Sequence, residues 1–558
     1  MEARIWHKSY APGVPKSLKF EKLTVSAALT RSAKNHPDTV ALNYMGRKIT
    51  YSELDRLVNQ FARALIGLGI KEGDKVAMIL PNLPQTIIAD MAVYRIGAVV
   101  AQNNPLYTER ELAYQLNDSD AVLAITLNLL VPRILKLMPE TKIKKVIGCH
   151  IHSYLPFPKK QLFPYVKKAM YKELETNDTV LQFEDLIAKQ SDAPVPEKSK
   201  WDKLGTLIYT GGTTGVSKGV MLSHANMSCN VQQFAAWFPD LKEGEEKLIG
   251  TFPVFHSAGL TAIQNFLIWM AFTHLVIPRP ETKALVNMIK KDRPTFIPGA
   301  PTIFVGLLND PEFRKMKLSF IKGFFSGAAP LAAETIRDIK ELTGAFMCEV
   351  YGSTETTPIA CVTPWGGTIK PGTVGIPVPD TDVKIVDIDT GKKTLKQGQT
   401  GEICIKGPQV MMGYYKKPKE TAAALKNGWF YTGDIGHFDS DGYLMITDRK
   451  KDMIIASGYN IYPVEIDGIL MDHPKILEAC TIGVPDSYRG ESVKAYVVVK
   501  PGESLTKDEL MKFCKEKLAA YKVPKDIEFI NELPKSAVGK ILRREVRELD
   551  KKKREAAS

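Results

Sequence analysis

Residues 75–102 read KVAMILPNLPQTIIADMAVYRIGAVVAQ and contain three pieces of different character. The first, KVAMIL (75–80), and the last, AVVAQ (98–102), are continuous apolar runs, which are typical of parallel strands buried on both faces. The middle piece, TIIADMAVYRIG (86–97), has the apolar spacing of a helix. A strand, a helix and a strand with short links predict a βαβ unit. The same pattern recurs near 273–303, so most of the chain is predicted to be α/β.

The regions on either side of this unit predict further elements. Upstream, SELDRLVNQFARALI (52–66) places its apolar residues on one helical face, with Ser52 as the expected N-cap. Downstream, residues 371–450 have frequent Gly and Pro and short β-like runs such as VKIVDI and GEICIKG. This pattern predicts a small antiparallel β subdomain.

The last part of the chain has the pattern of a compact α+β unit. Strand-like TIGV and VKAYVVVK precede the helical TKDELMKFCKEKLAAY, and the polar run DRKKD (448–452) is a candidate hinge. We therefore expect a large N-terminal domain (1–450) with stacked α/β layers, followed by a small α+β C-terminal domain (451–558).

The composition, 44% hydrophobic and 25% charged over 558 residues, indicates a soluble globular protein and excludes disorder or a disulfide scaffold. The seven cysteines form no CxxC pair, which indicates free thiols in a reducing compartment. The N-terminus, MEARIWHKSY, lacks the apolar core of a signal peptide, so a cytoplasmic location is predicted. Within the uncharged stretch 248–278, the apolar core 259–278 is about long enough to span a bilayer. Its Gln264, Asn265 and His274 instead favour a buried helix and strand.

The net charge is +13, from 75 Lys and Arg against 62 Asp and Glu, which favours anionic partners such as nucleotides, coenzyme A or lipid headgroups. Residues 154–172, YLPFPKKQLFPYVKKAMYK, interleave five lysines with five aromatic residues. A solvated loop is the favoured interpretation, and peripheral contact with an anionic bilayer at the inner face of the cell membrane is the alternative. No nucleic-acid-binding motif accompanies this stretch, so no nucleic-acid partner is predicted.

The strongest local motif is LIYTGGTTGVSKGVMLSH (207–224). An apolar strand leads into a turn rich in Gly and Thr, followed by Lys218. Glycines let backbone N–H groups point at phosphate oxygens, threonines donate from their hydroxyls, and the lysine adds positive charge. The spacing fits neither a Walker A loop nor GxGxxG. The motif therefore predicts phosphate binding of another kind, with a plain Gly-rich turn as the alternative.

Three further motifs carry groups suited to a nucleotide. Tyr351 can stack on a purine, Glu355 can hold Mg²⁺, Asp434 can grip ribose hydroxyls, and Lys540 can stabilise charge on an α-phosphate. Taken singly, these motifs have plain alternatives: a polar surface turn, an Asx-turn and a solvated lysine. The motifs are EVYGSTETTP (349–358), NGWFYTGDIGHFDSDGYLMITDRKKDMIIASGYNIYP (427–463) and LPKSAVGKILRREV (533–546).

Taken together and in this order, the four motifs resemble the acyl-adenylate-forming superfamily of acyl-CoA synthetases, peptide-synthetase adenylation domains and luciferases. The resemblance covers nearly the whole chain, from ITYSEL (49–54) to Lys540, and GWFYTGDIGHFDSDGYLMITDRKK (428–451) looks like the fatty-acyl-CoA synthetase signature. It is closest to bacterial long-chain fatty acid–CoA ligases. It implies an enzyme that makes acyl-AMP and pyrophosphate from a fatty acid and ATP with Mg²⁺, and then transfers the acyl group to coenzyme A.

The resemblance also implies residue roles. Lys540 bridges carboxylate, α-phosphate and ribose, Thr354 contacts the α-phosphate, and Glu355 binds Mg²⁺. His256 lies beside the acyl pocket, with a core histidine as the equal alternative. The phosphate loop, adenine pocket and ribose contacts are assigned to Thr210, Gly211, Gly212, Thr213, Thr214, Gly215, Lys218, Gly327, Ala328, Ala329, Glu349, Tyr351, Gly352, Ser353, Asp434 and Arg449.

For the second step, the resemblance implies that the C-terminal domain rotates about a hinge at Lys451, which removes Lys540 and admits the thiol. Ser457, Gly458 and Tyr459 then face the coenzyme A tunnel. Some relatives carry a lysine in an IKYKG-like stretch where this chain has IIASG (454–458). The residues of the thioester step therefore stay open.

The core motifs do not fix the acid. The stretch 248–278 and residues 299–304 either wall a hydrophobic pocket or pack the core, and Trp237 is a candidate gate. The alternatives to a long-chain ligase are a medium-chain or aryl acyl-CoA ligase, an acyl-AMP ligase that delivers to a carrier protein, and a non-catalytic relative that binds lipid or nucleotide. Monomer and homodimer both stay open.

Overall fold

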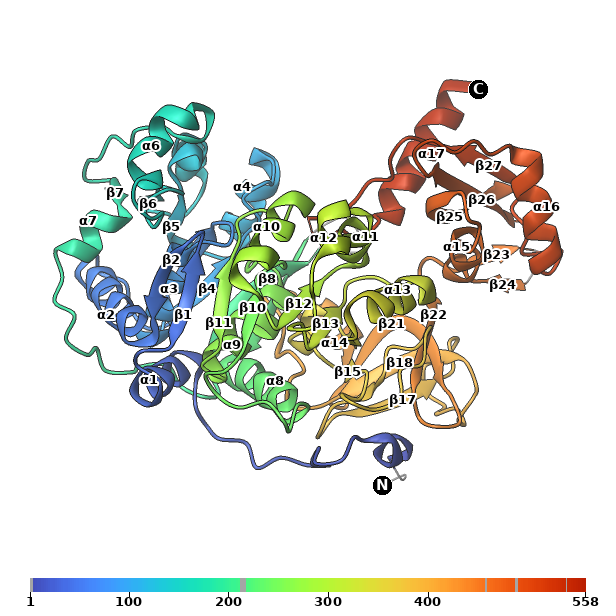
Figure 1. Cartoon of the computed structure of the whole chain (residues 1–558), viewed down its shortest axis with the longest axis horizontal. Coiled ribbons are helices and arrows are strands. Elements are labelled where there is room, and N and C mark those ends of the chain that lie inside the picture. The colour runs from blue at the N-terminus through green and yellow to red at the C-terminus, as the bar shows by residue number, and fades with distance from the viewer. Residues whose placement is uncertain (1–3, 211–216, 457–458, 487–489, 538, 558) are drawn as a thin grey trace.

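The structure is a computed structural model that describes residues 4–210, 217–456, 459–486, 490–537 and 539–557. Four sheets organise these residues (Figure 1). The predicted βαβ unit is confirmed as β3 (Lys75–Ile79), α3 (Pro84–Arg95) and β4 (Val99–Gln102), with the two strands parallel. All twelve residues of α3 are buried, because this helix packs against α1 (Val25–Asn35), α2 (Tyr51–Gly67) and the sheet.

The first large sheet contains the βαβ unit and has eight strands. Its central strands are parallel, and the last two strand pairs at one edge are antiparallel. In spatial order they are β19 (Gly413–Tyr414), β9 (Lys218–Ser223), β8 (Leu204–Thr210), β4, β3, β5 (Ala121–Leu127), β6 (Lys145–Cys149) and β7 (Val180–Gln182).

The second large sheet has nine strands and is also parallel at its centre. Antiparallel pairs close both edges. Its strands in spatial order are β16 (Ile376–Pro377), β15 (Cys361–Val362), β14 (Phe346–Tyr351), β13 (Gly323–Ser326), β12 (Phe296–Gly299), β10 (Lys247–Ile249), β11 (Thr273–Val276), β1 (Val40–Tyr44) and β2 (Arg47–Thr50).

The two large sheets enclose a shared core and carry helices on their outer faces. On β3, Val76 and Met78 belong to the shared core, whereas Ala77 and Ile79 belong to a second cluster under the outer helices. This alternation produces the stacked α/β layers that the sequence predicts. The inner helices include α1, α2, α3, α8 (His224–Ala236) and α9 (Phe266–Trp269), and the outer ones α4 (Glu109–Asp118), α5 (Val131–Leu137), α10 (Thr282–Asp292), α11 (Pro301–Asn309), α12 (Pro311–Lys315) and α13 (Ala333–Thr343).

The predicted helix over 52–66 is α2, but its N-cap is not the expected residue. The hydroxyl oxygen of Thr50 accepts a hydrogen bond from the Glu53 backbone N–H at 3.2 Å. The prediction of Ser52 is wrong because Thr50 keeps the extended conformation of the preceding strand, while the chain is already helical from Tyr51. A cap needs a non-helical backbone with a helix directly after it.

The uncharged stretch 248–278 lies inside the protein. It contains the end of β10, a π-helix (Ala258–Asn265), α9 and β11, and Leu260, Phe266 and Leu275 are no more than 1% exposed. This confirms the interpretation as a buried helix and strand. Across the described ranges, no helix has the length and apolar character needed to cross a membrane.

The third sheet confirms the predicted antiparallel subdomain. All its strand pairs are antiparallel, and β21 lies between β18 and β22. The strands are β17 (Asp382–Val386), β18 (Gly401–Lys406), β20 (Leu425–Lys426), β21 (Trp429–Phe438) and β22 (Leu444–Arg449), and α14 (Pro418–Ala424) lies beside them.

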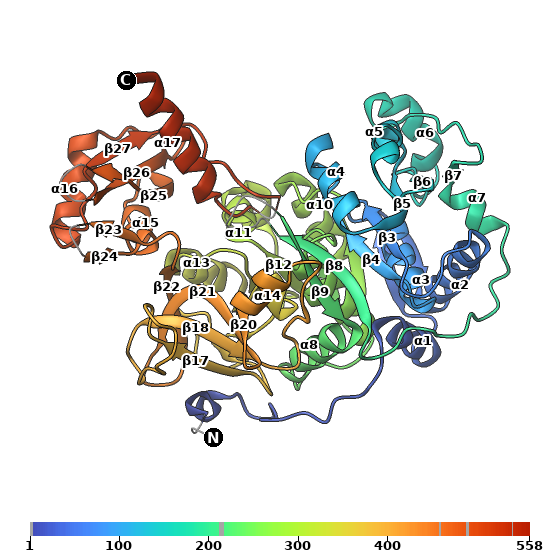
Figure 2. The ribbon, with the colours of Figure 1, turned by 180° about the vertical axis from the view of Figure 1, so that it is seen from behind.

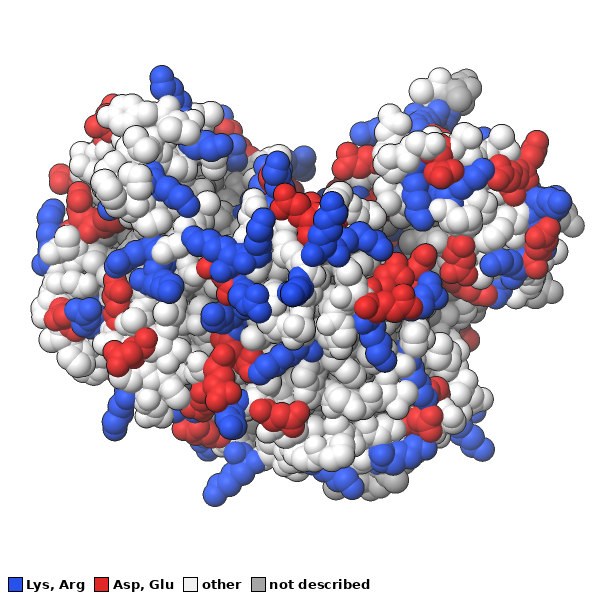
Figure 3. All heavy atoms as spheres, viewed as in Figure 1, with Lys and Arg blue, Asp and Glu red and all other residues white. Residues whose placement is uncertain are grey.

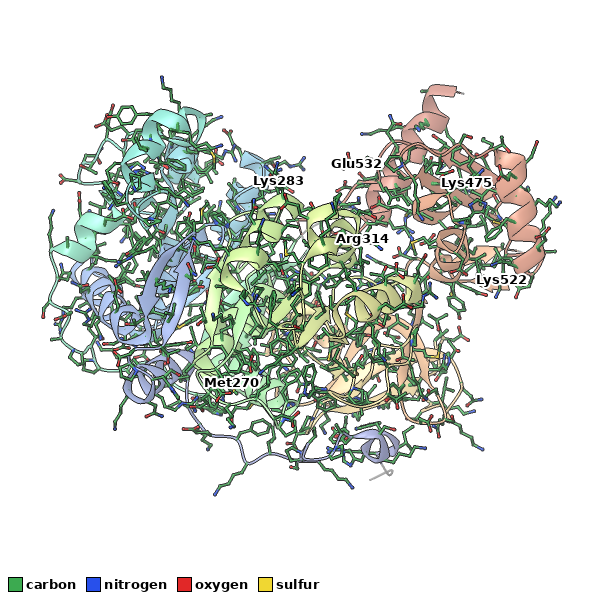
Figure 4. The ribbon with its side chains drawn as sticks, in the orientation of Figure 1. Met270, Lys283, Arg314, Lys475, Lys522 and Glu532 are labelled. Carbon is green, nitrogen blue, oxygen red and sulfur yellow. The ribbon has the colours of Figure 1, made fainter. Side chains whose placement is uncertain are left out.

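The C-terminal residues form a separate α+β lobe, coloured red in Figures 1 and 2. This lobe has its own hydrophobic cluster. Ion pairs tie its elements together, including Lys475 with Glu509 at 3.2 Å and Lys522 with Glu465 at 2.6 Å; both lysines are labelled in Figure 4. Its elements are β23 (Ile454–Ala456), β24 (Tyr459–Ile461), α15 (Pro463–Met471), β25 (Ile476–Asp486), β26 (Gly490–Val499), α16 (Lys507–Lys517), β27 (Asp526–Phe529) and α17 (Arg543–Ala557).

Candidate active site

A cavity of about 810 Å³ lies at the carboxyl ends of central strands of the second large sheet. Pro298 of β12, Ser326 of β13 and Val350 of β14 line one side of it. Ligands of open α/β sheets bind at this edge. Arg449 at the end of β22 and Lys540 from the C-terminal lobe line the other side. The cavity is therefore shared by three parts of the fold.

The Gly-rich motif joins β8 to β9. β8 ends at Thr210 and β9 begins at Lys218, and these two residues pair across the antiparallel hairpin. Both line the cavity, and the Ser217 hydroxyl donates to the Thr210 carbonyl at 3.0 Å. The two ends of the loop thus lie at the cavity. The other predicted loop residues, Gly211, Gly212, Thr213, Thr214 and Gly215, lie outside the described residues.

The turn after β14 presents a second group of predicted residues. A Cβ atom on Gly352 would lie 1.7 Å from the Pro358 carbonyl oxygen, so only glycine fits there. Ser353, Thr354 and Glu355 follow in a tight turn, and all line the cavity. Thr354 is buried, and its hydroxyl oxygen lies 3.3 Å from that of Ser257. The motif is therefore part of the cavity wall rather than a surface turn.

A tyrosine that the sequence analysis did not single out connects two of the predicted residues. Tyr414 of β19 donates its hydroxyl hydrogen to Glu355 Oε1 at 2.9 Å. Lys218 Nζ lies 4.8 Å from the centre of the same ring, which is cation–π distance. β19 holds the ring there because it pairs with β9, the strand that begins at Lys218. In the sequence, Tyr414 lies within the segment GEICIKGPQVMMGYY (401–415), and no pattern in that segment distinguishes it from its neighbours.

Asp434 lies at the centre of a hydrogen-bonded group. It belongs to β21, not to a free turn, and pairs in register with Arg449 of β22. Arg449 Nε lies 2.9 Å from one carboxylate oxygen, and the Tyr351 hydroxyl donates to the other at 2.8 Å. Because the pair stabilises the charged form, Asp434 raises the pKa of Arg449. This arrangement replaces the Asx-turn interpretation with a fixed carboxylate beside the cavity.

A short hairpin-like loop presents Lys540. The Ser536 N–H donates to the Lys540 carbonyl at 2.8 Å, and the Lys540 N–H donates to the Ser536 hydroxyl oxygen at 3.2 Å. Gly539, just before it, has φ +77° and approaches α11: a Cβ there would lie 2.9 Å from the Thr302 hydroxyl oxygen. The loop thus carries Lys540 from the C-terminal lobe into a cavity formed mostly by the rest of the chain.

Charges around Lys540 set its protonation. The positive charge of Arg449, followed by burial, lowers the pKa of Lys540 to about 8. Burial, with a smaller contribution from Lys540, lowers the pKa of His256 to about 4. His256 is therefore neutral around neutral pH, and its Nδ1 accepts from the Ala258 N–H at 3.3 Å. Because His256 lines the cavity, the alternative of a core histidine does not describe it.

The remaining predicted residues divide into two groups. Gly327 and Ala328 line the cavity, and Ala328 adopts a left-handed φ of +71° at the end of β13. Other predicted residues do not line the cavity in the part of the chain that the structure describes: Ala329, Glu349, Tyr351, Asp434 and Lys451. Burial raises the pKa of Glu349 to about 8. Ser457 and Gly458 lie outside the described residues.

Part of the cavity lining is apolar, and we call it the apolar end of the cavity. Its lining includes Phe234, Phe252, Ala258, Ala262, Ile263 and Phe325. Part of the stretch 248–278 thus walls a pocket, as one of the two interpretations expected, whereas Phe304 packs in a core cluster. Trp237 is fully buried, and its indole N–H donates to the Thr363 carbonyl at 3.0 Å. It does not line the cavity, so the prediction of a gate is wrong for this arrangement.

Comparisons with known proteins agree with this geometry. The family model of the AMP-binding enzymes matches residues 29–415, and that of the AMP-binding enzyme C-terminal domain matches residues 465–540. The chain is 42% identical to a long-chain-fatty-acid–CoA ligase of Bacillus subtilis (strain 168) over 97% of each chain. It is 37% identical to one of Escherichia coli O157:H7 over 98% of each.

A solved structure shows the same architecture. The crystal structure of ATP-bound MatB from Rhodopseudomonas palustris has a TM-score of 0.84 at 28% identity, covering 94% of this chain and 99% of that one. Family models cover most of the chain, and curated relatives match nearly its whole length. The chain therefore belongs to the family of AMP-binding enzymes.

Proposed function

We propose that the protein is an AMP-forming long-chain fatty acid–CoA ligase. One observation carries the proposal: a single cavity has Lys218, Glu355 and Lys540 at its polar end and aromatic and aliphatic side chains at the other. A nucleotide needs the first environment, and an alkyl chain needs the second. The bacterial relatives named above carry the same activity in their names.

In the first step, a carboxylate oxygen of the fatty acid attacks the α-phosphorus of ATP. The bond from that phosphorus to the β-phosphate oxygen breaks, and pyrophosphate leaves. Both reactants are anions, so their approach needs positive charge. Lys218 and Lys540 supply it from the cavity wall, and Lys540 is placed to stabilise the negative charge that develops on the α-phosphate. Asp434, fixed by Arg449 and Tyr351, is assigned to the ribose hydroxyls.

The donor set fits Mg²⁺ bound together with a nucleotide. Mg²⁺ keeps several waters and uses one or two carboxylates plus substrate phosphates. Glu355 lies in the cavity wall, and Tyr414 engages only one of its oxygens. The described residues contain no group of three His, Cys, Asp or Glu that would form a cage. Glu355 would hold the ion, which supplies charge neutralisation at the phosphates.

In the second step, the thiol of coenzyme A attacks the acyl carbon, the carbon–oxygen bond to AMP breaks, and AMP leaves. Lys540 occupies the cavity in this structure. We assign residues 1–450 to a fixed domain and 451–558 to a domain that rotates about Lys451 and withdraws this lysine. Ser457, Gly458 and Tyr459 are assigned to the tunnel for coenzyme A.

A cytoplasmic location is part of the proposal. All seven cysteines are buried and free, which suits a reducing compartment.

The test is a reaction with Mg²⁺-ATP and palmitate, with and without coenzyme A, in which AMP, pyrophosphate and palmitoyl-CoA are measured. We expect palmitoyl-CoA and AMP in equal amounts. Pyrophosphate release without thioester would instead identify an acyl-AMP ligase. Turnover only with shorter or aromatic acids would overturn the long-chain assignment.

A further inference from the structure

A patch of exposed apolar side chains lies outside the cavity lining. Of the fifteen large apolar side chains that are exposed among the described residues, five fall within residues 157–170. A random scatter of apolar groups would not concentrate them in one short segment, so the patch needs an explanation. The five residues, with their exposed fractions, are Phe157 (83%), Leu162 (51%), Tyr165 (74%), Val166 (70%) and Met170 (43%).

These side chains face outward because the segment is anchored by others. Leu155 is buried in the main core, and Tyr154 and Phe163 pack against it. The Phe163 ring stacks on His152, with ring centres 5.3 Å apart. On helix α6 (Lys159–Val166), Leu162, Tyr165 and Val166 are spaced i, i+3, i+4 and share one face. The helix is thus held by one side and presents an apolar stripe on the other.

The patch is also strongly basic. Residues 154–172 contain five lysines and no acidic residue. All five lysines are exposed, and Lys159 donates to the Met45 carbonyl at 3.5 Å. In Figure 3 the lobe that carries α6, at the upper left, is largely white, with blue side chains projecting from it and some red ones at its margins. We call residues 157–172 the α6 surface.

The neighbouring β1–β2 turn extends the α6 surface. Met45 in that turn is 45% exposed and touches Lys159 through its carbonyl. A Cβ placed on Gly46 would lie 3.2 Å from Lys291 Nζ and 3.6 Å from Pro156. One more apolar group and one more cation thus border the surface, from a separate part of the chain.

We propose that the α6 surface docks the protein on an anionic lipid bilayer. The apolar side chains enter the interfacial region while the lysines lie over the headgroups, which is the pattern of interfacial helices. Exposed Leu, Val and Met argue against RNA, because nucleic-acid sites combine cations with stacking aromatic rings rather than aliphatic groups. Binding itself does not depend on the proposed ligase activity; only its use, the capture of a fatty acid at the membrane, rests on that activity.

The position of the surface is compatible with catalysis. Figures 1 and 2 both place α6 and the C-terminal lobe at opposite ends of the molecule's long axis. A protein held through the α6 surface therefore leaves the lobe that carries Lys540 free to move.

The test is sedimentation of the full chain with vesicles of phosphatidylcholine, with and without about one-third phosphatidylglycerol, at several salt concentrations. We expect binding to the anionic vesicles that weakens with salt. Lys167→Gln with Lys168→Gln should lower the partition coefficient about tenfold or more. Tyr165→Ser with Val166→Ser should lower it by a similar factor at every salt concentration, because it removes apolar insertion.

Matched controls use exposed residues elsewhere. Lys512→Gln with Lys515→Gln on α16, and Ile66→Ser on α2, should leave binding unchanged. Circular dichroism of each variant tests folding, and ligase activity with a soluble short acid should match that of the parent. Equal loss in patch and control variants, equal binding to neutral vesicles, or preference for RNA over vesicles would each overturn the proposal. None of these outcomes bears on the ligase reaction, because the binding assay contains no substrate.

Discussion

The two ends of the cavity are built in opposite ways. At or beside the polar end, two carboxylates are each held by one or two partners at hydrogen-bond distance: Asp434 by Arg449 and Tyr351, and Glu355 by Tyr414. At the apolar end, side chains are held by packing with several neighbours. Phe325, for example, stacks on Phe296 and also contacts two other phenylalanine rings.

This difference predicts how each end responds to substitution. A charge-assisted hydrogen bond depends on a few atoms, so removing one atom removes most of its contribution. Hydrophobic contact grows with area and is shared among neighbours, so one methylene changes it by only about 0.8 kcal/mol. The polar end should therefore show large, specific losses, and the apolar end small, graded ones.

Lys540→Ala should have the largest effect. The residue is the cation that the C-terminal lobe brings to the cavity, and losing one such electrostatic donor costs about a hundredfold to a thousandfold in rate. The measurement is pyrophosphate release without coenzyme A. Thioester formation from supplied acyl-AMP should be nearly unchanged, and Lys552→Ala in the exposed tail is the control. An adenylation rate near that of the parent would remove Lys540 from the mechanism.

The comparison also shows what sequence can predict. Contiguous patterns gave reliable expectations: the β3–α3–β4 unit and the antiparallel sheet over 371–450 are as predicted, because neighbouring residues in the chain build them. Contacts between residues that are distant in sequence were harder to predict. Tyr414 and Glu355 are 59 positions apart, and a two-residue strand has no periodicity to reveal which way its tyrosine points.

The two wrong predictions have a related cause: each concerns a residue whose surroundings the local sequence pattern does not show. Trp237 is not the predicted gate, because it is fully buried and its indole N–H donates to the Thr363 carbonyl, 126 positions away in sequence. The N-cap of α2 is Thr50 rather than Ser52, because Thr50 keeps the extended backbone of the preceding strand. The motifs alone indicate nucleotide chemistry for Lys218, Glu355 and Lys540, the resemblance to a family adds other cavity residues, and the structure adds which of them lie together.

Asp434→Asn should have the second largest effect. The amide keeps the shape but loses the negative charge that holds Arg449. Because the Arg449 guanidinium is partly exposed, we expect kcat/KM for ATP to fall about thirtyfold, which corresponds to about 2 kcal/mol. The fall should come chiefly from a higher KM for ATP. Steady-state kinetics at varied ATP measures it, with the exposed Asp508→Asn as control. A changed KM for the fatty acid alone would contradict the ribose assignment.

The pH dependence of adenylation should report Lys540. Its pKa is lowered to about 8, and the reaction needs the protonated form, so kcat/KM for ATP should fall as pH rises through that value. The fall should approach about tenfold per pH unit. Omitting coenzyme A keeps the titration of its thiol out of the profile. In Lys540→Arg the alkaline limb should disappear, whatever the remaining rate; a limb that persists belongs to another group.

Tyr414→Phe tests the link between Glu355 and Lys218. The variant keeps the ring beneath Lys218 but removes the hydroxyl that donates to Glu355. Losing a hydrogen bond to a charged group typically costs about 2 kcal/mol, so the half-saturating Mg²⁺ concentration should rise about thirtyfold. Tyr414→Leu should in addition raise the KM for ATP, since the cation–π contact is lost as well. If both variants change only thermal stability, Tyr414 is structural and does not position Glu355.

The smallest effect is expected at the apolar end, for Ile263→Val. This side chain lines the cavity and is 2% exposed, and the change removes one methylene. The loss in stability should be about 1 kcal/mol. The activity ratio between two saturated acids that differ by two carbons should shift by about fourfold toward the longer one, since the pocket gains room for one methylene.

Ile268→Val on α9 is equally buried but does not line the cavity, so it should match the stability change without moving the ratio. If Ile263→Val instead reduced activity a hundredfold with every acid, the apolar end would be as atom-specific as the polar end, and the contrast between them would fail.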